Sequence, residues 1–161
     1  MDPFTDEEWT RLMRAPFVAG MAISLADPGG PIEAFKETAA TLKTVTGAAG
    51  SGGRGELVDA VAREVADELR QRKSPVAGFR PKGATAGVEI LDELREVNRI
   101  VSEKAAPDDA AAYRDWLHST AKEAADAAKE GGFMGFHAER VSQGEQRMLD
   151  SIRDALGAPA A

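Results

Sequence analysis

The most apolar stretch of the chain covers residues 16–26, which read PFVAGMAISLA. Apart from Gly20 and Ser24 every position is apolar, so a helix built from it is apolar on all sides. Such a helix belongs in a protein interior, and this one is much shorter than the roughly 20 residues that span a bilayer. Pro16 suits the first turn of a helix. The Asp-Pro-Gly-Gly sequence that follows residue 26 is a helix stop signal. We therefore predict a buried central helix over residues 16–26.

The rest of the chain reads as amphipathic helices that pack around the central one. Apolar residues recur three and four positions apart, which is the period of a helix with one buried face. No segment shows the alternation that predicts a half-buried strand. The predicted fold is all-α, a single domain over residues 1–161 with a bundle of about seven helices. The amphipathic helices are expected over residues 6–15, 31–47, 56–73, 88–104, 107–130 and 143–156.

Two helix starts carry specific capping signals. Thr5 and Glu8 have the spacing of a capping box, and so do Ser142 and Glu145. In such a box each side chain accepts a hydrogen bond from a backbone N–H at the other end of the first turn. Phe4 and the aromatic residue at position 9 also occupy the two positions of a hydrophobic staple. These signals predict helices that begin next to Thr5 and Ser142.

One pattern suggests an internal duplication. The same order of features occurs in residues 16–73 and again in residues 87–156. Each segment has an apolar helix and a proline break. A helix that opens with an Ala-aromatic-basic-acidic sequence follows, and then a further amphipathic helix. A duplication predicts two three-helix units related by a pseudo-twofold axis. The alternative is coincidence among alanine-rich helices.

Composition narrows the function classes. A chain of 161 residues is the size of one domain with one core. Its 27 acidic and 20 basic side chains give a formal net charge of −7, which argues against general nucleic-acid binding. The absence of cysteine excludes disulfides and thiolate ligands. The acidic residues near the amino end do not fit a signal peptide. We expect a cytoplasmic protein, and the alanine, glycine and arginine content is typical of a GC-rich bacterial genome.

Two groups of residues are candidates for binding a partner. Phe133, Met134 and Phe136 lie among glycines. They could plug the bundle, form an adaptable contact for a partner or act as a lid over a small cavity. Phe79 lies next to Arg80 and close to Lys82. An exposed aromatic ring between cations could bind an acidic partner, RNA or an anionic lipid. The basic residues just before this segment, Arg70, Arg72 and Lys73, have a simpler explanation, because they complement the C-terminal end of the preceding helix.

The metal-ligating candidates centre on two residues one helical turn apart. Asp115 and His118 have the three-residue spacing that places a carboxylate and an imidazole on one helix face. Glu33 and Glu37 could add carboxylates, as could glutamates at positions 123 and 130. An ordinary surface pair is the alternative. The remaining histidine, at position 137, is an acid–base candidate by residue type alone.

No pattern of a known catalytic site is present. The GSGGRG sequence at 50–55 matches a dinucleotide-binding fingerprint only in its letters, because a predicted helix and not a strand precedes it. No serine lies in a nucleophile elbow, and there is no Walker A sequence. We expect no cofactor and assign no catalytic residue. The sequence favours a non-catalytic protein-interaction or regulatory module that binds another protein or itself. The alternative is a helical bundle that binds a metal or a small ligand through Asp115 and His118.

Overall fold

The computed structural model is all-helical over the residues it describes, which are 3–26, 31–129 and 141–157. Side chains of residues 31–37 and 128–129 also lie outside the description. In these ranges there is no β-strand, and none of the helices has both the length and the apolar character to cross a bilayer. The elements are α1 (Asp6–Ala26), α2 (Pro31–Ser51), α3 (Glu56–Arg70), the short 3-10 helix η1 (Gly83–Thr85), α4 (Ala86–Lys104), α5 (Pro107–Lys129) and α6 (Gln143–Ala155).

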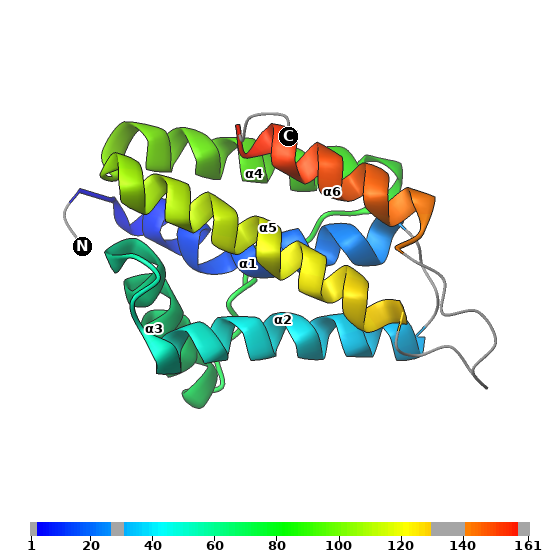
Figure 1. Cartoon of the computed structure of the whole chain (residues 1–161), viewed down its shortest axis with the longest axis horizontal. Helices are drawn as coiled ribbons and strands as arrows, with labels where there is room; N and C mark the ends of the chain where they lie inside the picture. Colours follow the sequence, from blue (N-terminus) through cyan, green and yellow to red (C-terminus); the bar gives the residue numbers. More distant parts are fainter. Residues whose placement is uncertain (1–2, 27–30, 130–140, 158–161) are drawn as a thin grey trace.

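Helix α1 lies in the middle of the bundle and contacts each of the other α-helices. Figure 1 shows α1 and α5 running in one direction along the bundle, with α2, α4 and α6 running in the opposite direction. The shorter α3 crosses the end of α2 (Figure 1). Six side chains of α1 have no exposed surface: Leu12, Ala15, Val18, Ala19, Ala22 and Ile23. The predicted central helix is therefore part of the core.

One side of α1 is less enclosed than its apolar sequence predicts. Phe17, Met21 and Ser24 are half-buried, and the side chain of Leu25 is 45% exposed. A helix that is apolar on every side is expected to be covered on every side, and this one is not. Phe17, Met21 and Ser24 face α2 and the segment that joins α3 to α4, so a binding site could form there.

The predicted break between residues 15 and 16 is absent, because α1 is continuous through Pro16. Proline has no N–H, so the carbonyl of Leu12 loses its helical donor. The hydroxyl of Tyr113 on α5 donates to that carbonyl at 2.6 Å. This tertiary hydrogen bond replaces the missing one, and the two predicted helices are one. The described residues accordingly form six α-helices in place of the predicted seven.

The helix-start predictions are confirmed by the hydrogen bonds. The N–H of Thr5 donates to Glu8 at 2.7 Å, and the N–H of Glu8 donates to Thr5 Oγ1 at 3.2 Å. Ser142 and Glu145 exchange the same pair of bonds at 2.8 and 3.1 Å. The rings of Phe4 and Trp9 lie 6.0 Å apart between centroids. Both signals are local in sequence, which explains why the pattern alone could locate them.

Helix ends are less accurately predicted. Helix α2 continues to Ser51, beyond the expected end at Gly47. Helix α3 ends at Arg70 and not at the expected Lys73, and Arg72 after it has a positive φ of 59°. A residue with that backbone conformation cannot continue a right-handed helix.

The packing lends the predicted duplication no support. In residues 16–73 the middle helix, α2, packs extensively against α3. In residues 87–156 the corresponding pair, α5 and α6, shares a much smaller contact, and so do α4 and α5. Corresponding helices of the two segments therefore do not make corresponding contacts.

Candidate functional site

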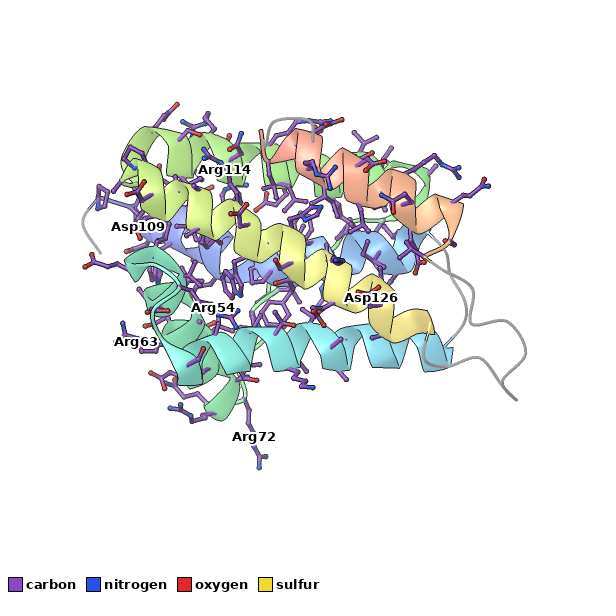
Figure 2. The ribbon with its side chains drawn as sticks, viewed as in Figure 1. Arg54, Arg63, Arg72, Asp109, Arg114 and Asp126 are labelled. Carbon is purple, nitrogen blue, oxygen red and sulfur yellow. The ribbon has the colours of Figure 1, made fainter. Side chains whose placement is uncertain are left out.

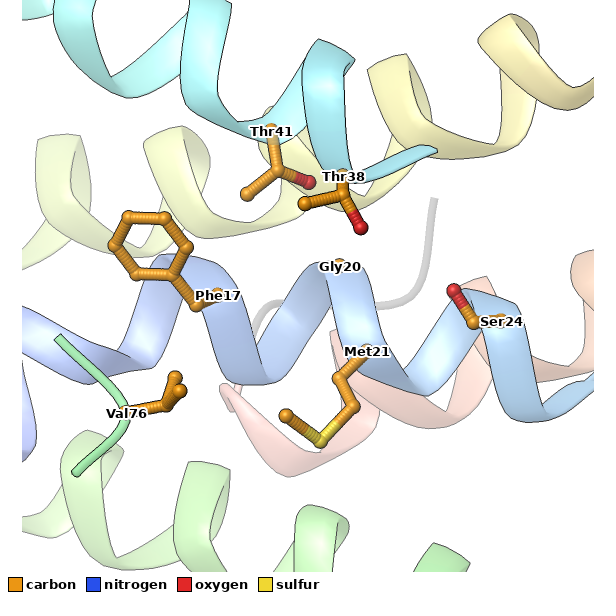
Figure 3. A pocket seen from close by; sticks show the side chains of 7 residues that line it. All are labelled: Phe17, Gly20, Met21, Ser24, Thr38, Thr41 and Val76. Carbon is orange, nitrogen blue, oxygen red and sulfur yellow. The ribbon is translucent and has the colours of Figure 1, made fainter. Parts of the chain in front are cut away.

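An uncharged pocket opens on the less enclosed side of α1. It has a volume of about 190 Å³ and lies between α1, α2 and the segment 71–85; we refer to it as the α1–α2 groove. Figure 3 shows the side chains that form it. The lining residues are Phe17, Gly20, Met21, Ser24, Thr38, Thr41 and Val76. None of them carries a charge, so the groove suits an uncharged, largely apolar group.

The floor of the groove depends on a close approach between Gly20 of α1 and Thr41 of α2. A Cβ atom added to Gly20 would overlap the Oγ1 atom of Thr41. Thr41 is only 3% exposed. Its Oγ1 atom is buried and has no hydrogen-bond partner. Glycine at position 20 therefore leaves room for the Thr41 hydroxyl, which is buried against α1 and is not paired.

The walls of the groove are apolar and adaptable. Phe17 and Met21 lie on one face of α1, and Val76 belongs to the connection between α3 and α4. All three are half-buried. A methionine side chain has three rotatable bonds and a polarisable sulfur, so it can fit bound groups of different shapes.

Phe79, predicted as an exposed aromatic residue, is half-buried against the core. The guanidinium carbon of Arg14 lies 5.1 Å from the centroid of its ring. Arg14 in turn donates to the buried carboxylate of Glu93 through Nε at 2.7 Å, and its Nη2 lies 2.6 Å from the same oxygen. Phe79 therefore covers an ion pair between α1 and α4. Arg80 and Lys82 are exposed, and their role in binding stays a prediction.

The other partner candidates, Phe133, Met134 and Phe136, lie outside the described residues, as does the histidine at position 137. The glycine-rich sequence at 50–55 is the end of α2 and its connection to α3. The N–H of Gly53 donates to the carboxylate of Asp59 at 2.7 Å. A carboxylate of the chain itself therefore accepts the hydrogen bond that a phosphate would need from this loop. This arrangement is compatible with a linker and not with a phosphate site.

Of the predicted metal ligands Asp115, His118, Glu33 and Glu37, the structure describes the side chains of the first two only. Asp115 is exposed, whereas His118 is half-buried, and its Nε2 atom is buried without a hydrogen-bond partner. Burial lowers the pKa of His118, and the positive charge of Arg153 on α6 lowers it further. Glu33 and Glu37 lie on α2, but their side chains are outside the description. Among the described residues, no three His, Asp or Glu side chains are grouped closely enough to hold an ion.

A second, more open cleft of about 540 Å³ lies between α2 and α5. Lys43 and Arg54 line it together with Glu123 and Asp126. Figure 2 shows Arg54 and Asp126 along the face where the two helices meet, whereas Arg72 points away from the bundle. Because charges of both signs line this cleft, it does not select a ligand of either sign.

Comparison of the chain with known protein families, with curated proteins and with solved structures finds no match. The functional argument therefore rests on the geometry of the chain itself. The α1–α2 groove is the strongest site on that ground, since it combines an apolar wall with a suitable volume. The sequence signals for it are Gly20 and Ser24, which interrupt an otherwise apolar stretch and both line the groove.

Proposed function

We propose that the protein is a non-catalytic binding module that takes a small uncharged ligand into the α1–α2 groove. The observation that carries this proposal is a pocket of about 190 Å³ whose lining residues carry no charge. Apolar cavities of about 150 Å³ are large enough to bind benzene. The groove therefore has room for one ring or a short branched chain. The composition supports the bacterial cytosol as its setting.

The proposal is tested with a neutral hydrocarbon probe, α-methylstyrene. The protein is labelled with ¹³C at its methionine methyl groups and titrated with the probe. We expect the Met21 methyl signal to shift, and the Met148 signal on α6 to stay in place. The dissociation constant for so small a probe should be on the order of 1 mM.

A variant that fills the groove provides the control for specificity. Val76→Trp places an indole ring into the groove and should abolish the shift of Met21. Ala77→Trp places the same ring at the neighbouring position, which is exposed, and should leave binding intact. If the Met21 signal does not move at the solubility limit of the probe, or if both variants bind alike, the groove is not a ligand site.

A protein-interaction function is the second candidate, and the exposed side of α1 favours it. Phe17, Met21 and Leu25 are four residues apart and follow one face of the helix, with Leu25 45% exposed. Such a strip suits an apolar surface of a partner protein or of a second copy of the chain. Sedimentation velocity tests the second copy. Self-association that Leu25→Asp abolishes and that exposed Ala111→Asp leaves intact would support it; a chain that stays monomeric when concentrated removes self-association.

A further inference from the structure

Three charged side chains of the cleft between α2 and α5 lack the ion pairs that similar side chains form on α4. There, the exposed side chain of Arg95 pairs with Asp92 at 2.5 Å. Lys43, Arg54 and Glu123 line the cleft and are exposed, but within the described part of the chain none of them has an ion-pair partner. The cleft therefore contains charges of opposite sign that do not neutralise each other by direct contact.

The direction of the two helices separates these charges. Helices α2 and α5 run in opposite directions (Figure 1), so Lys43 and Glu123 line the middle of the cleft from opposite sides. Arg54 follows the C-terminal end of α2, whereas Asp126 lies in the last turn of α5. These two residues are therefore placed towards opposite ends of the cleft, as Figure 2 shows. The cations belong to α2 and the segment after it, and the acids belong to α5.

This separation decides which ligand fits the cleft. An anion is attracted by the cations but repelled by the acids, and a cation meets the reverse arrangement. A molecule that carries both charges can be attracted at both walls. The cleft has a volume of about 540 Å³, and no large side chain fills the space between the charges. Its remaining lining residues are all small: Ala40, Thr44, Gly47, Ser119 and Ala127.

We propose that this cleft binds a small zwitterion, such as an amino acid, between its two walls. The carboxylate of the ligand lies towards Lys43 and Arg54, and its ammonium group lies towards Glu123 and Asp126. The site is separate from the α1–α2 groove, and neither proposal depends on the other.

The test uses two zwitterions of different length, γ-aminobutyrate and ε-aminocaproate, so that two spacings of the charges are sampled. Two analogues of the longer probe carry a single charge: hexanoate lacks the ammonium group, and hexylamine lacks the carboxylate. Each compound is titrated at neutral pH into ¹⁵N-labelled protein. The backbone amide signals of Gly47 and Ser119, one from each wall, report binding. The amide signal of Gly157, which follows α6, is the reference that should stay in place.

We expect at least one of the zwitterions to shift both signals, with a dissociation constant on the order of 10 mM. Hexanoate and hexylamine should each bind about fivefold more weakly than ε-aminocaproate, the effect of losing one exposed charge pair.

Two neutralising variants test the two walls separately. Arg54→Gln removes a cation and Glu123→Gln removes an acid, and each should weaken binding of the zwitterion about fivefold. Arg72→Gln and Glu64→Gln make the same changes outside the cleft and should leave binding intact. Arg72 points away from the bundle in Figure 2. All four side chains are exposed, so the fold should tolerate each substitution.

Three results would overturn the inference. The first is that neither zwitterion shifts the signals of Gly47 and Ser119 at about ten times the expected dissociation constant. The second is that hexanoate or hexylamine binds as tightly as ε-aminocaproate, which would mean that the cleft selects one sign of charge. The third is that the control variants weaken binding as much as the cleft variants do. None of these results bears on the α1–α2 groove, which is tested through the signal of Met21.

Discussion

The hydroxyl of Tyr113 donates a hydrogen bond to the carbonyl oxygen of Leu12 at 2.6 Å. Leu12 is four residues before Pro16, so its carbonyl is the one that the proline deprives of a helical donor. Tyr113 has no exposed surface, and burial raises the pKa of its hydroxyl well above the ordinary value. The hydroxyl therefore stays protonated and remains a donor. The continuity of α1 depends on this contact with α5.

Replacing Tyr113 with phenylalanine should lower the free energy of unfolding by about 1–3 kcal/mol, because the carbonyl of Leu12 is then buried without a donor. Urea unfolding measures this change. The variant Pro16→Ala restores an N–H that can donate to Leu12, so Tyr113→Phe should cost less in that background. Equal costs in the two backgrounds would show that the hydroxyl does not replace the proline's missing donor.

Gly20 and Gly47, both within helices, provide a matched pair for the packing of the groove. A Cβ on Gly20 would overlap Thr41, whereas a Cβ on Gly47 meets no atom within 4 Å. Gly47→Ala should raise stability by about 0.5–1 kcal/mol through helix propensity. Gly20→Ala should lose that gain, because overpacking costs about 1–3 kcal/mol. Thermal unfolding of the two variants measures the difference, and an equal rise in both would mean that α1 and α2 do not approach closely at Gly20.

The ion pair under Phe79 gives a second stability prediction. Glu93 is 6% exposed and pairs with both Arg11 and Arg14. Glu93→Gln should lower the free energy of unfolding by about 2–4 kcal/mol, between the values for exposed and for fully buried pairs. The exposed pair of Asp92 and Arg95 on the same helix is the control, and Asp92→Asn should cost less than about 1 kcal/mol. Similar costs for the two variants would contradict the burial of Glu93.

Acid stability should depend on Glu8. Hydrogen bonds from Lys104, at 2.6 Å, and from Thr5 lower the pKa of its carboxyl from 4.5 to about 2. The unfolded chain therefore binds this proton more readily than the folded protein. The stability that Glu8 contributes is present above about pH 5 and is lost as the pH falls towards 2. Glu8→Gln should flatten the decline in unfolding midpoint between these values, and an unchanged pH profile would show that Glu8 is not involved.

Interactions within a single turn could be predicted from the sequence, and so could the amphipathic character of each helix. The capping boxes at Thr5 and Ser142 are local, because both partners lie within three residues of each other. The central role of residues 16–26 was also predictable, because no other stretch is apolar on nearly every side. The open side of that helix was not predictable, since it depends on how α2 and the segment 71–85 pack beside it.

The sequence alone determined that the chain forms helices and which faces of them are apolar, since helix periodicity and capping are properties of neighbouring residues. Only the tertiary structure decided that α1 passes through Pro16, that Phe79 covers an ion pair, and that Gly20 and Thr41 meet at the floor of a groove. Each of these features needs a partner from a distant part of the chain. A periodic pattern shows that a face is buried, but it does not identify the donor or the surface that the face meets.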